Sequence, residues 1–326
     1  MPLDPVLTPY IPFPTLPDRI DFVAFRERDA AAVNALVAQV AEPGPQVADK
    51  QIVSIPVEDG TIDIAIYRPS LDDGLLPAHL YFHGGGWVAG TGLSPFTDII
   101  GRERAVGGRC VAITVDYRKA PEHQYPAGLN DCQAALHWVV EHASEIGVDT
   151  SIITVGGGSA GANLAAALCI KNRDEGGPAI ALQLLEVPAV DLTASLPSHR
   201  DPDLGTKYAL ATVDVERLVR YYLGENGDAR DPYASPLFAA SHADLPPAYI
   251  MSAEFDVLRD DGQAYAERLT ADGVSAVSSL QLGHIHPSSG FTKVMPAARM
   301  WRDEALTVLG VINDGGSFEQ AVAATR

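Results

Sequence analysis

Cysteine, basic residues and long hydrophobic runs are all scarce in this sequence. The 326 residues include only three cysteines, an odd number that lies in apolar segments and therefore indicates buried thiols rather than a disulfide framework or a catalytic cysteine. The 23 lysines and arginines are outnumbered by 42 aspartates and glutamates, which gives a formal net charge of −19. Nucleic acid and anionic membrane surfaces would repel such a chain, so we expect neither as a partner.

Signals for export and for membrane insertion are also missing. The first residues lack the basic region and the apolar core of a signal peptide, and no run approaches the roughly 20 apolar residues that cross a bilayer. We therefore expect a cytoplasmic protein. Hydrophobic residues make up 47% of the chain, which is enough for a sizeable core in one large domain or two ordinary ones.

The N-terminal part of the chain is expected to hold an arm, a helix and a hairpin. Six prolines within residues 1–20 favour an extended arm that wraps around the rest of the protein. Apolar residues at three- and four-residue spacing predict a cap helix over 22–40, which together with the arm makes an N-terminal unit of residues 1–45. The two-residue alternation of 51–56 and 61–67 predicts an antiparallel hairpin.

From residue 78 the pattern changes to short apolar strands that alternate with helices. This pattern is typical of an α/β protein with a mostly parallel sheet and helices on both faces, and with the hairpin it predicts eight strands. The expected strands are 78–82, 110–115, 152–155, 179–185, 248–251 and 276–282. The expected helices are 95–106, 129–146, 160–173, 259–271 and 292–309.

One segment does not fit this alternation. Residues 191–231 are too long for a simple crossover and contain a helix-like run at 213–223, so we expect a cap insertion there. The main α/β domain would then comprise residues 46–190 and 232–313. Residues 314–326 are expected to form a weakly tied tail.

Residues 157–161, Gly-Gly-Ser-Ala-Gly, carry a G-x-S-x-G motif between a predicted strand and a predicted helix. In this motif a tight strand-to-helix turn exposes a serine hydroxyl, here that of Ser159, at the edge of a sheet. The flanking glycines allow the strand and helix backbones to approach closely, and the helix N-terminus favours negative charge nearby. The alternative is a glycine-rich turn with an incidental serine.

Residues 83–87, His-Gly-Gly-Gly-Trp, follow directly on the predicted strand at 78–82. Consecutive glycines let main-chain N–H groups approach a ligand without a side-chain clash. Preorganised N–H groups stabilise the negative oxygen that forms when an ester carbonyl is attacked. The position and composition match the oxyanion loop of lipases and esterases, and the alternative is an ordinary glycine-rich turn.

Together with residues 115–123 and 254–260, these two motifs resemble the ordered signature blocks of bacterial esterases of the hormone-sensitive-lipase family. The resemblance extends over about residues 50–310. It implies an α/β-hydrolase fold with a small helical cap, and a serine, an acid and a histidine in that order along the chain. It also implies a serine carboxylesterase that acts on short to medium acyl esters of small molecules and needs no cofactor.

A reactive serine needs a base to accept its proton, and the base needs a carboxylate that orients it. The resemblance assigns the carboxylate to Asp256, which follows the predicted strand at 248–251 by five residues. Glu254 and Asp260 remain rivals for this role. Either of them could instead be a solvated or helix-capping carboxylate.

The resemblance assigns the base to His286, the fourth residue of a Gly-x-x-His frame. Relatives usually continue directly with Gly-Phe after this frame, whereas here Pro-Ser-Ser at 287–289 intervenes. This departure leaves His284 as a rival for the base.

The resemblance also assigns the oxyanion donors to the backbone N–H groups of Gly85, Gly86 and Ala160. Gly84 would support the turn of the loop. His83 would hold the loop in place rather than act as a second base.

The block at 115–123 follows a different strand from Ser159, so its polar side chains are expected to brace the oxyanion loop. These side chains are those of Asp116, Tyr117, Arg118 and Glu122. Trp87, at the end of the oxyanion loop, is expected either to line the acyl pocket or to belong to the core.

The sequence predicts neither a metal site nor a cofactor. His284 and His286 have no cysteine or carboxylate partner at ligand spacing, and the glycines at 84–86 do not form the G-x-G-x-x-G frame of a dinucleotide loop. An amidase or lactone hydrolase with the same residues remains an alternative. A ligand-binding receptor is disfavoured, since it predicts a missing serine, acid or histidine. Relatives suggest a homodimer through the last strand.

Overall fold

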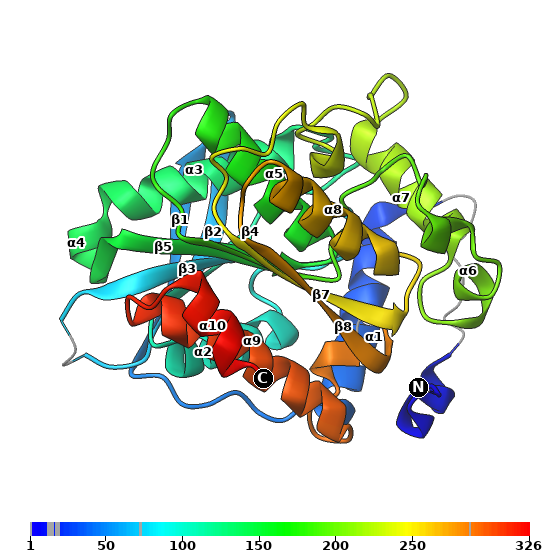
Figure 1. Ribbon diagram of the computed structural model, residues 1–326, viewed down its shortest axis with the longest axis horizontal. Helices are drawn as coiled ribbons and strands as arrows, with labels where there is room; N and C mark the ends of the chain where they lie inside the picture. The colour runs from blue at the N-terminus through cyan, green and yellow to red at the C-terminus, as the bar shows by residue number, and fades with distance from the viewer. Residues whose placement is uncertain (1, 12–15, 17–19, 72–73, 287) are drawn as a thin grey trace.

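One eight-stranded sheet forms the centre of the computed structural model, which describes residues 2–11, 16, 20–71, 74–286 and 288–326 (Figure 1). The strands are β1 (Asp49–Val57), β2 (Gly60–Arg68), β3 (Leu76–Phe82), β4 (Val111–Asp116), β5 (Val148–Gly158), β6 (Leu182–Glu186), β7 (Ala248–Phe255) and β8 (Ala276–Ile285). Their order is β1-β2-β4-β3-β5-β6-β7-β8. Only the pairs β1–β2 and β2–β4 are antiparallel, so the predicted mostly parallel sheet is confirmed.

Helices cover both faces of this sheet, as the sequence predicts (Figure 1). The α-helices are α1 (Phe22–Val40), α2 (Pro95–Gly108), α3 (Ala127–Glu141), α4 (Ala143–Ile146), α5 (Ala160–Asp174), α6 (Leu204–Lys207), α7 (Thr212–Leu223), α8 (Arg259–Ala271), α9 (Pro296–Asn313) and α10 (Phe318–Ala324). Short 3-10 helices are η1 (Pro5–Tyr10), η2 (Pro197–Arg200), η3 (Pro236–Phe238) and η4 (Ser288–Gly290). Helices α3, α5 and α8 lie on one face, and α2, α9 and α10 lie on the other.

The middle strands are buried on both faces, which explains their nearly continuous apolar sequences. Every residue of β6 is buried, whereas β1, at the edge of the sheet, has several exposed side chains. β6 begins at Leu182, where its pairing with β5 starts, and not at the predicted residue 179. The alanine-rich helix α5 is buried along most of its length, and its small side chains let it lie close to β5.

Two predicted helices differ most from the structure, each for a local reason. The helix predicted at 129–146 is divided into α3 and α4, because His142 leaves helical geometry (φ −105°, ψ 14°). The helix predicted at 292–309 begins only at Pro296. Proline disfavours the helical conformation in the preceding residue, and Met295 is indeed extended (φ −123°, ψ 107°).

The two ends of the chain are held more firmly than predicted. The prediction of a weakly tied tail at 314–326 is wrong, since this segment contains α10, whose Phe318 and Ala321 are buried against α9. The predicted extended arm is also partly wrong, because it contains η1, whose Leu7 is fully buried. Parts of the predicted arm after η1 lie outside the described residues.

The segment 191–231 leaves the sheet after β6 and contains η2, α6 and α7. Helices α6 and α7 lie beyond the end of the sheet toward which the β7 and β8 arrows point (Figure 1). α7 packs next to α1, since the rings of Phe22 and Tyr221 are 4.8 Å apart between centroids. The N-terminal helix and the insertion are therefore neighbours at the end of the sheet where the candidate site lies.

Candidate active site

The turn between β5 and α5 holds Ser159 in a backbone conformation that residues with a side chain rarely adopt (φ 56°, ψ −120°). A Cβ atom at Gly161 would collide with the backbone oxygen of Phe82, and one at Gly157 would lie 2.6 Å from the same oxygen. These glycines therefore let α5 start directly against β3. The Ser159 N–H donates to the Glu186 carbonyl at 2.8 Å, which connects the turn to β6.

The carboxyl ends of β7 and β8 bring a carboxylate and an imidazole to Ser159. His286 Nε2 lies 3.0 Å from Ser159 Oγ, and His286 Nδ1 lies 2.7 Å from Asp256 Oδ2. Because an ionised carboxylate only accepts hydrogen bonds, Nδ1 of the neutral imidazole carries the hydrogen and Nε2 is free to accept the serine proton. The Asp256 side chain is 1% exposed and that of His286 is 11% exposed, so water is largely kept from this pair.

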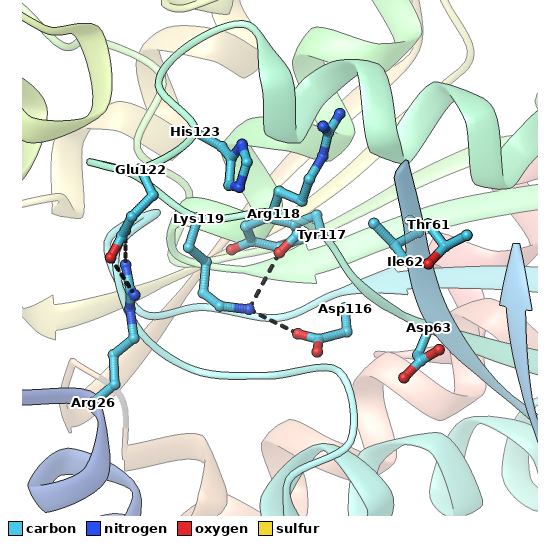
Figure 2. Close-up of a pocket in the computed structure, with 10 residues that line it drawn as sticks. All are labelled: Arg26, Thr61, Ile62, Asp63, Asp116, Tyr117, Arg118, Lys119, Glu122 and His123. Atoms are coloured by element: carbon cyan, nitrogen blue, oxygen red, sulfur yellow. Dashed lines mark hydrogen bonds and ion pairs between the residues drawn. The ribbon is translucent and has the colours of Figure 1, made fainter. Parts of the chain in front are cut away.

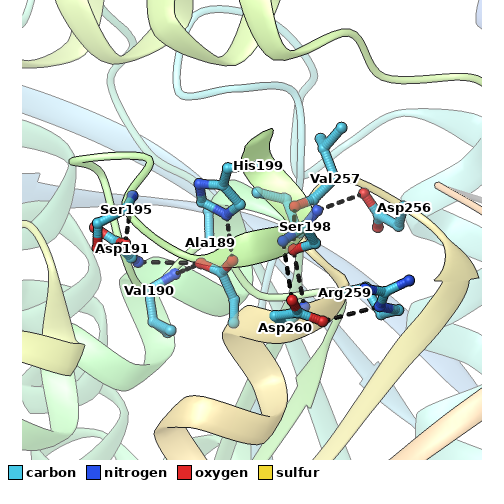
Figure 3. Close-up of polar contacts among 12 residues, drawn as sticks. Ala189, Val190, Asp191, Ser195, Ser198, His199, Asp256, Val257, Arg259 and Asp260 are labelled. Atoms are coloured by element: carbon cyan, nitrogen blue, oxygen red, sulfur yellow. Dashed lines mark hydrogen bonds and ion pairs between the residues drawn. The ribbon is translucent and has the colours of Figure 1, made fainter. Parts of the chain in front are cut away.

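The two rival carboxylates make other contacts. Glu254 accepts a hydrogen bond from the Gly283 N–H at 2.7 Å, and Asp260 accepts one from the Ser198 N–H at 2.9 Å. Figure 3 shows Asp256 and Asp260 directed toward different partners. Of the three candidate carboxylates, Asp256 is the one that the structure places against the imidazole next to the serine.

The rival histidine lies in a different environment. His284 is 1% exposed, its Nδ1 lies 2.8 Å from Ser288 Oγ, and its ring centroid is 5.0 Å from that of Trp301. Burial lowers the pKa of His284 to about 4. Ser288, part of the stretch that interrupts the usual frame, also bonds the backbone of Ile285 and so holds this turn. Pro287, in the same stretch, lies outside the described residues.

Hydrogen bonds within the oxyanion loop set the directions of two N–H groups. In a trans peptide the C=O and the N–H point in opposite directions. The Gly84 carbonyl accepts a bond from His83 Nδ1 at 2.7 Å, and the Gly85 carbonyl accepts one from the Ala89 N–H at 2.9 Å. The N–H groups of Gly85 and Gly86 consequently point away from the partners that hold the loop.

The loop and the serine turn lie side by side. A Cβ atom at Gly84 would be 3.5 Å from Ser159 Cβ. Within the part of the chain that the structure describes, the N–H groups of Gly85, Gly86 and Ala160 donate to no protein group. All three are therefore available to a bound ligand next to the serine.

Asp116 and Tyr117, in the block after β4, brace the oxyanion loop as predicted. Tyr117 Oη donates to the His83 carbonyl at 2.8 Å, and the two rings stack with centroids 4.2 Å apart. Asp116 accepts a bond from the Gly92 N–H at 3.3 Å. Burial would raise the pKa of Asp116, but His83 and Lys119 outweigh it and hold that pKa below its ordinary value. Burial lowers the pKa of His83, which favours the neutral ring as a support for the loop.

Of the other two side chains of this block, Arg118 differs from the prediction, whereas Glu122 is connected to the oxyanion loop through Arg26, whose Nε donates to the Val88 carbonyl. Arg118 donates to Asp131 of α3 at 2.7 Å, so it braces a helix and not the oxyanion loop. Glu122 accepts two bonds from Arg26 of α1, at 2.9 and 2.6 Å (Figure 2). Arg26, Arg118 and Glu122 border an open polar pocket of about 410 Å³, and Ser159 does not line it.

Trp87 belongs to the core, which was the second of its two predicted roles. It is 3% exposed, its ring stacks on Tyr222 of α7 at 4.6 Å, and its Nε1 donates to Asn163 Oδ1 at 3.1 Å. Asn163 Nδ2 also donates to the Ala189 and Ala234 carbonyls at 2.7 and 2.8 Å, so this residue connects three segments. This connecting role was not predicted from the sequence. The sequence signal for this role is an asparagine within an apolar helix, because a buried side-chain amide needs hydrogen-bond partners.

A second unpredicted group is a buried polar cluster that joins the segment 191–231 to the turn after Asp256 (Figure 3). Asp261 Oδ1 accepts a bond from the Val190 N–H at 2.8 Å, and its Oδ2 lies 2.5 Å from His199 Nε2. Ser198 Oγ donates at 2.7 Å to the carbonyl of the residue that follows Asp256. Burial opposes the charge on His199, but Asp261 outweighs it and raises the His199 pKa. The partners lie 62 residues apart, so no local pattern reveals them.

The three cysteines are buried and unbridged, as predicted. Burial raises the pKa of Cys110 to about 12, so its thiolate does not form near neutral pH. Among the described residues, no group of three or more His, Cys, Asp or Glu side chains is placed to hold a metal ion. In the same part of the chain, no helix combines the length and the apolar character that crossing a membrane requires.

Several known proteins with similar sequences and structures are named as esterases. Residues 79–289 match a family described as having the alpha/beta hydrolase fold. The chain is 38% identical over 324 residues to the esterase LipI of Mycobacterium tuberculosis, with 96% of each chain covered. It is 35% identical to an arylesterase of Saccharolobus solfataricus, over 89% of this chain and 93% of that one. A Pyrobaculum calidifontis esterase structure matches with a TM-score of 0.88 at 35% identity, over 95% and 99% of the two chains.

Proposed function

Because this chain belongs to the α/β-hydrolase family, among the esterases that resemble hormone-sensitive lipase, we infer that it is a serine carboxylesterase. We propose Ser159 as the nucleophile, His286 as the base and Asp256 as the acid that orients the base. The observation that carries this proposal is the continuous run of contacts from carboxylate to imidazole to hydroxyl, at 2.7 and 3.0 Å. These distances suit proton transfer between positioned groups.

The proposed first step forms an acyl-enzyme. Ser159 Oγ attacks the acyl carbon of the ester while His286 Nε2 takes the hydroxyl proton. Asp256 stabilises the charged imidazole and does not itself become protonated. The tetrahedral intermediate then expels the alcohol, which takes the proton from His286. Water attacks the acyl-enzyme by the same route and releases the carboxylic acid.

The oxyanion of each tetrahedral intermediate is proposed to bind the N–H groups of Gly85, Gly86 and Ala160. Support comes from their lack of protein partners within the described residues, and from the bonds that orient the loop. Preorganised donors of this kind each contribute about 10²- to 10³-fold to kcat in serine hydrolases. His83 and Gly84 are proposed to hold the loop without touching the reacting atoms.

The proposed substrates are small-molecule esters with short to medium acyl chains. A Cβ atom at Gly86 would lie 2.6 Å from Leu218 Cδ1, so α7 packs directly on the oxyanion loop. We propose that residues 191–231 and α1 together form a cap that limits the length of acyl chain near Ser159. The remaining α/β elements would form the catalytic domain.

A hydrolysis profile over 4-nitrophenyl esters of increasing acyl length tests this function, with Ser159→Ala as the control. We expect the highest kcat/KM among the short and medium esters, little turnover of a palmitate ester, and loss of turnover in the variant. A fluorophosphonate should add one phosphonyl group to Ser159. Faster turnover of an amide or lactone than of any ester would replace the ester assignment, and absence of labelling would indicate a binding protein.

We also propose that two copies of the chain pair through β8. Among the described residues this strand ends the sheet, with β7 as its paired strand. Its Leu280 and Leu282 are 47% and 45% exposed, and an unpaired strand edge offers N–H and C=O groups to a second copy. Light scattering should give the mass of two chains for the wild type and a smaller mass for Leu282→Lys. A monomeric wild type at micromolar concentration would contradict the proposal.

A further inference from the structure

Arg26 connects the first helix to the oxyanion loop through hydrogen bonds. Arg26 of α1 donates from Nε to the Val88 carbonyl at 2.6 Å and from Nη2 to the Ala120 carbonyl at 2.8 Å. Val88 lies in the oxyanion loop, and Ala120 lies in the block that follows β4. One guanidinium group thus joins its own helix to two segments that are 62 and 94 residues away in the sequence.

The Val88 carbonyl belongs to the part of the loop that sets the direction of the substrate-facing N–H groups. On the other side of the same residue, the Val88 N–H donates to the Gly85 carbonyl at 3.2 Å. This bond helps to fix the peptide plane that Gly85 shares with Gly86, and hence the direction of the Gly86 N–H. A displacement of Val88 would therefore turn a proposed oxyanion donor.

The second carbonyl that Arg26 holds is tied to the same loop. The Ala120 N–H donates to the Trp87 carbonyl at 3.0 Å, so Arg26 and this bond together bring the two loops into contact. Glu122 keeps the guanidinium in the required plane through its two bonds to Arg26 (Figure 2). The bonds from Arg26 lower the pKa of Glu122, so the carboxylate stays charged near neutral pH.

The contacts of Arg26 form at an apolar junction rather than on an open surface. The side chain of Arg26 is 25% exposed, and its guanidinium carbon lies 5.7 Å from the centre of the Phe22 ring. The junction consists of buried Val88, Ala89 and Ala120 with Phe22, Phe25, Leu218 and Tyr221 packed against them. It contains residues of α1, of α7 and of both loops, so the guanidinium acts where the cap meets the candidate site.

We propose that Arg26 is a positioning residue for the oxyanion hole, which it serves by fixing the Val88 and Ala120 carbonyls and thereby aligning the Gly86 N–H. The inference rests on the proposed function, because it gives Arg26 a part in the same reaction. The N-terminal helix then supports transition-state binding as well as covering the site. Lysine cannot take over this role, since one ammonium group lacks the planar fork that bridges two carbonyls and a carboxylate.

The test compares Arg26→Lys and Arg26→Met with Arg28→Met, which changes an exposed arginine on the same helix. Titration with a fluorophosphonate gives the concentration of active enzyme, so loss of folded protein does not enter the rates. For 4-nitrophenyl acetate we expect kcat of both Arg26 variants to fall about 10- to 100-fold, with KM changed by less than about threefold. The Arg28 variant should keep the wild-type values.

Binding of a transition-state analogue separates positioning from a general structural role. A trifluoromethyl ketone adds to Ser159 and puts a negative oxygen in the oxyanion hole, so its Ki should rise by the factor by which kcat/KM falls. An unchanged kcat per active site in Arg26→Met would overturn the proposal. A fall in kcat with an unchanged Ki would also overturn it. Turnover retained by Ser159→Ala would instead refute the proposed function, whatever the Arg26 variants do.

Discussion

The proposed reacting groups of the site are positioned by constraints on individual residues. Ser159 has a positive φ of 56° at the start of α5, where its hydroxyl lies 3.0 Å from His286 Nε2 and the helix N-terminus favours negative charge. His286 is held through Nδ1 by Asp256, so its other ring nitrogen faces the serine. Substitutions at these residues should therefore affect the reaction more than the fold.

The two histidines of the loop after β8 should respond differently to substitution. His286→Ala removes the group that accepts the serine proton, so we expect kcat/KM to fall roughly 10⁴-fold or more. His284→Ala removes a buried ring that contacts Ser288 and Trp301, so we expect kcat/KM to stay within about tenfold of the wild type. Steady-state kinetics with circular dichroism as the folding control measures both. Turnover retained by His286→Ala would move the role of base to His284.

Buried His79 should make the stability of the fold dependent on pH. Burial, and then the charge of Arg104, lower the His79 pKa from 6.5 to about 3. The unfolded chain therefore binds a proton first as pH falls. Stability from neutral His79 is fully present above about pH 6.5 and is lost progressively toward about pH 3, by about 1.4 kcal/mol per pH unit.

Urea denaturation of the wild type and of His79→Gln between about pH 7 and pH 5 tests this dependence. The free energy of unfolding of the wild type should fall more steeply than that of the variant as the solution is acidified. Equal slopes for the two proteins would show that His79 does not titrate as its burial implies.

Elements with a regular hydrophobic period could be predicted, whereas elements that depend on distant partners could not. The predicted helices at 22–40 and 259–271 have the same ends as α1 and α8. By contrast, α10 is too short to be stable alone, and its burial depends on α9, so composition suggested a loose tail. The strands that pair in the middle of the sheet could be located by their apolar runs, but their ends depend on register.

The candidate site likewise has parts that could be predicted from the sequence and parts that could not. The serine turn and the oxyanion loop could be predicted, because close backbone approach requires glycine and leaves a contiguous motif. The contacts of Arg26, Asn163 and Asp261 join segments between 26 and 96 residues apart, and an arginine on a predicted helix resembles any solvated side chain. Such contacts follow from the packing of whole elements and have no local pattern.

The packing of α10 on α9 should contribute measurably to stability. Phe318 is 8% exposed, so Phe318→Ala should lower the free energy of unfolding by about 3 kcal/mol. The neighbouring Glu319 is exposed, and Glu319→Ala should lower the free energy of unfolding much less than Phe318→Ala does. Urea denaturation of the two variants gives the comparison. Equal free energies of unfolding for the two variants would support the loose tail that the sequence alone suggested.

At the scale of the whole molecule, the sheet is what assembles the site. Carboxyl ends of parallel strands meet at one edge, so the loops after β3, β5, β7 and β8 converge there. Ser159 and His286, 127 residues apart in sequence, come within 3.0 Å in this way. Helices α1 and α7, which we propose as parts of a cap, pack against each other and against the oxyanion loop at the same edge. The ester hydrolysis proposed at Ser159 therefore depends on the fold of nearly the whole chain.

Direct detection of the acyl-enzyme is the sharpest test of the account. The enzyme would be mixed with 4-nitrophenyl acetate, quenched in acid within the first turnovers, digested and analysed by mass spectrometry. We predict one acetyl group on the peptide that contains Ser159, formed as fast as the first burst of nitrophenol, and none in Ser159→Ala. An acetyl group on another residue during the burst, or undiminished hydrolysis by Ser159→Ala, would contradict the mechanism.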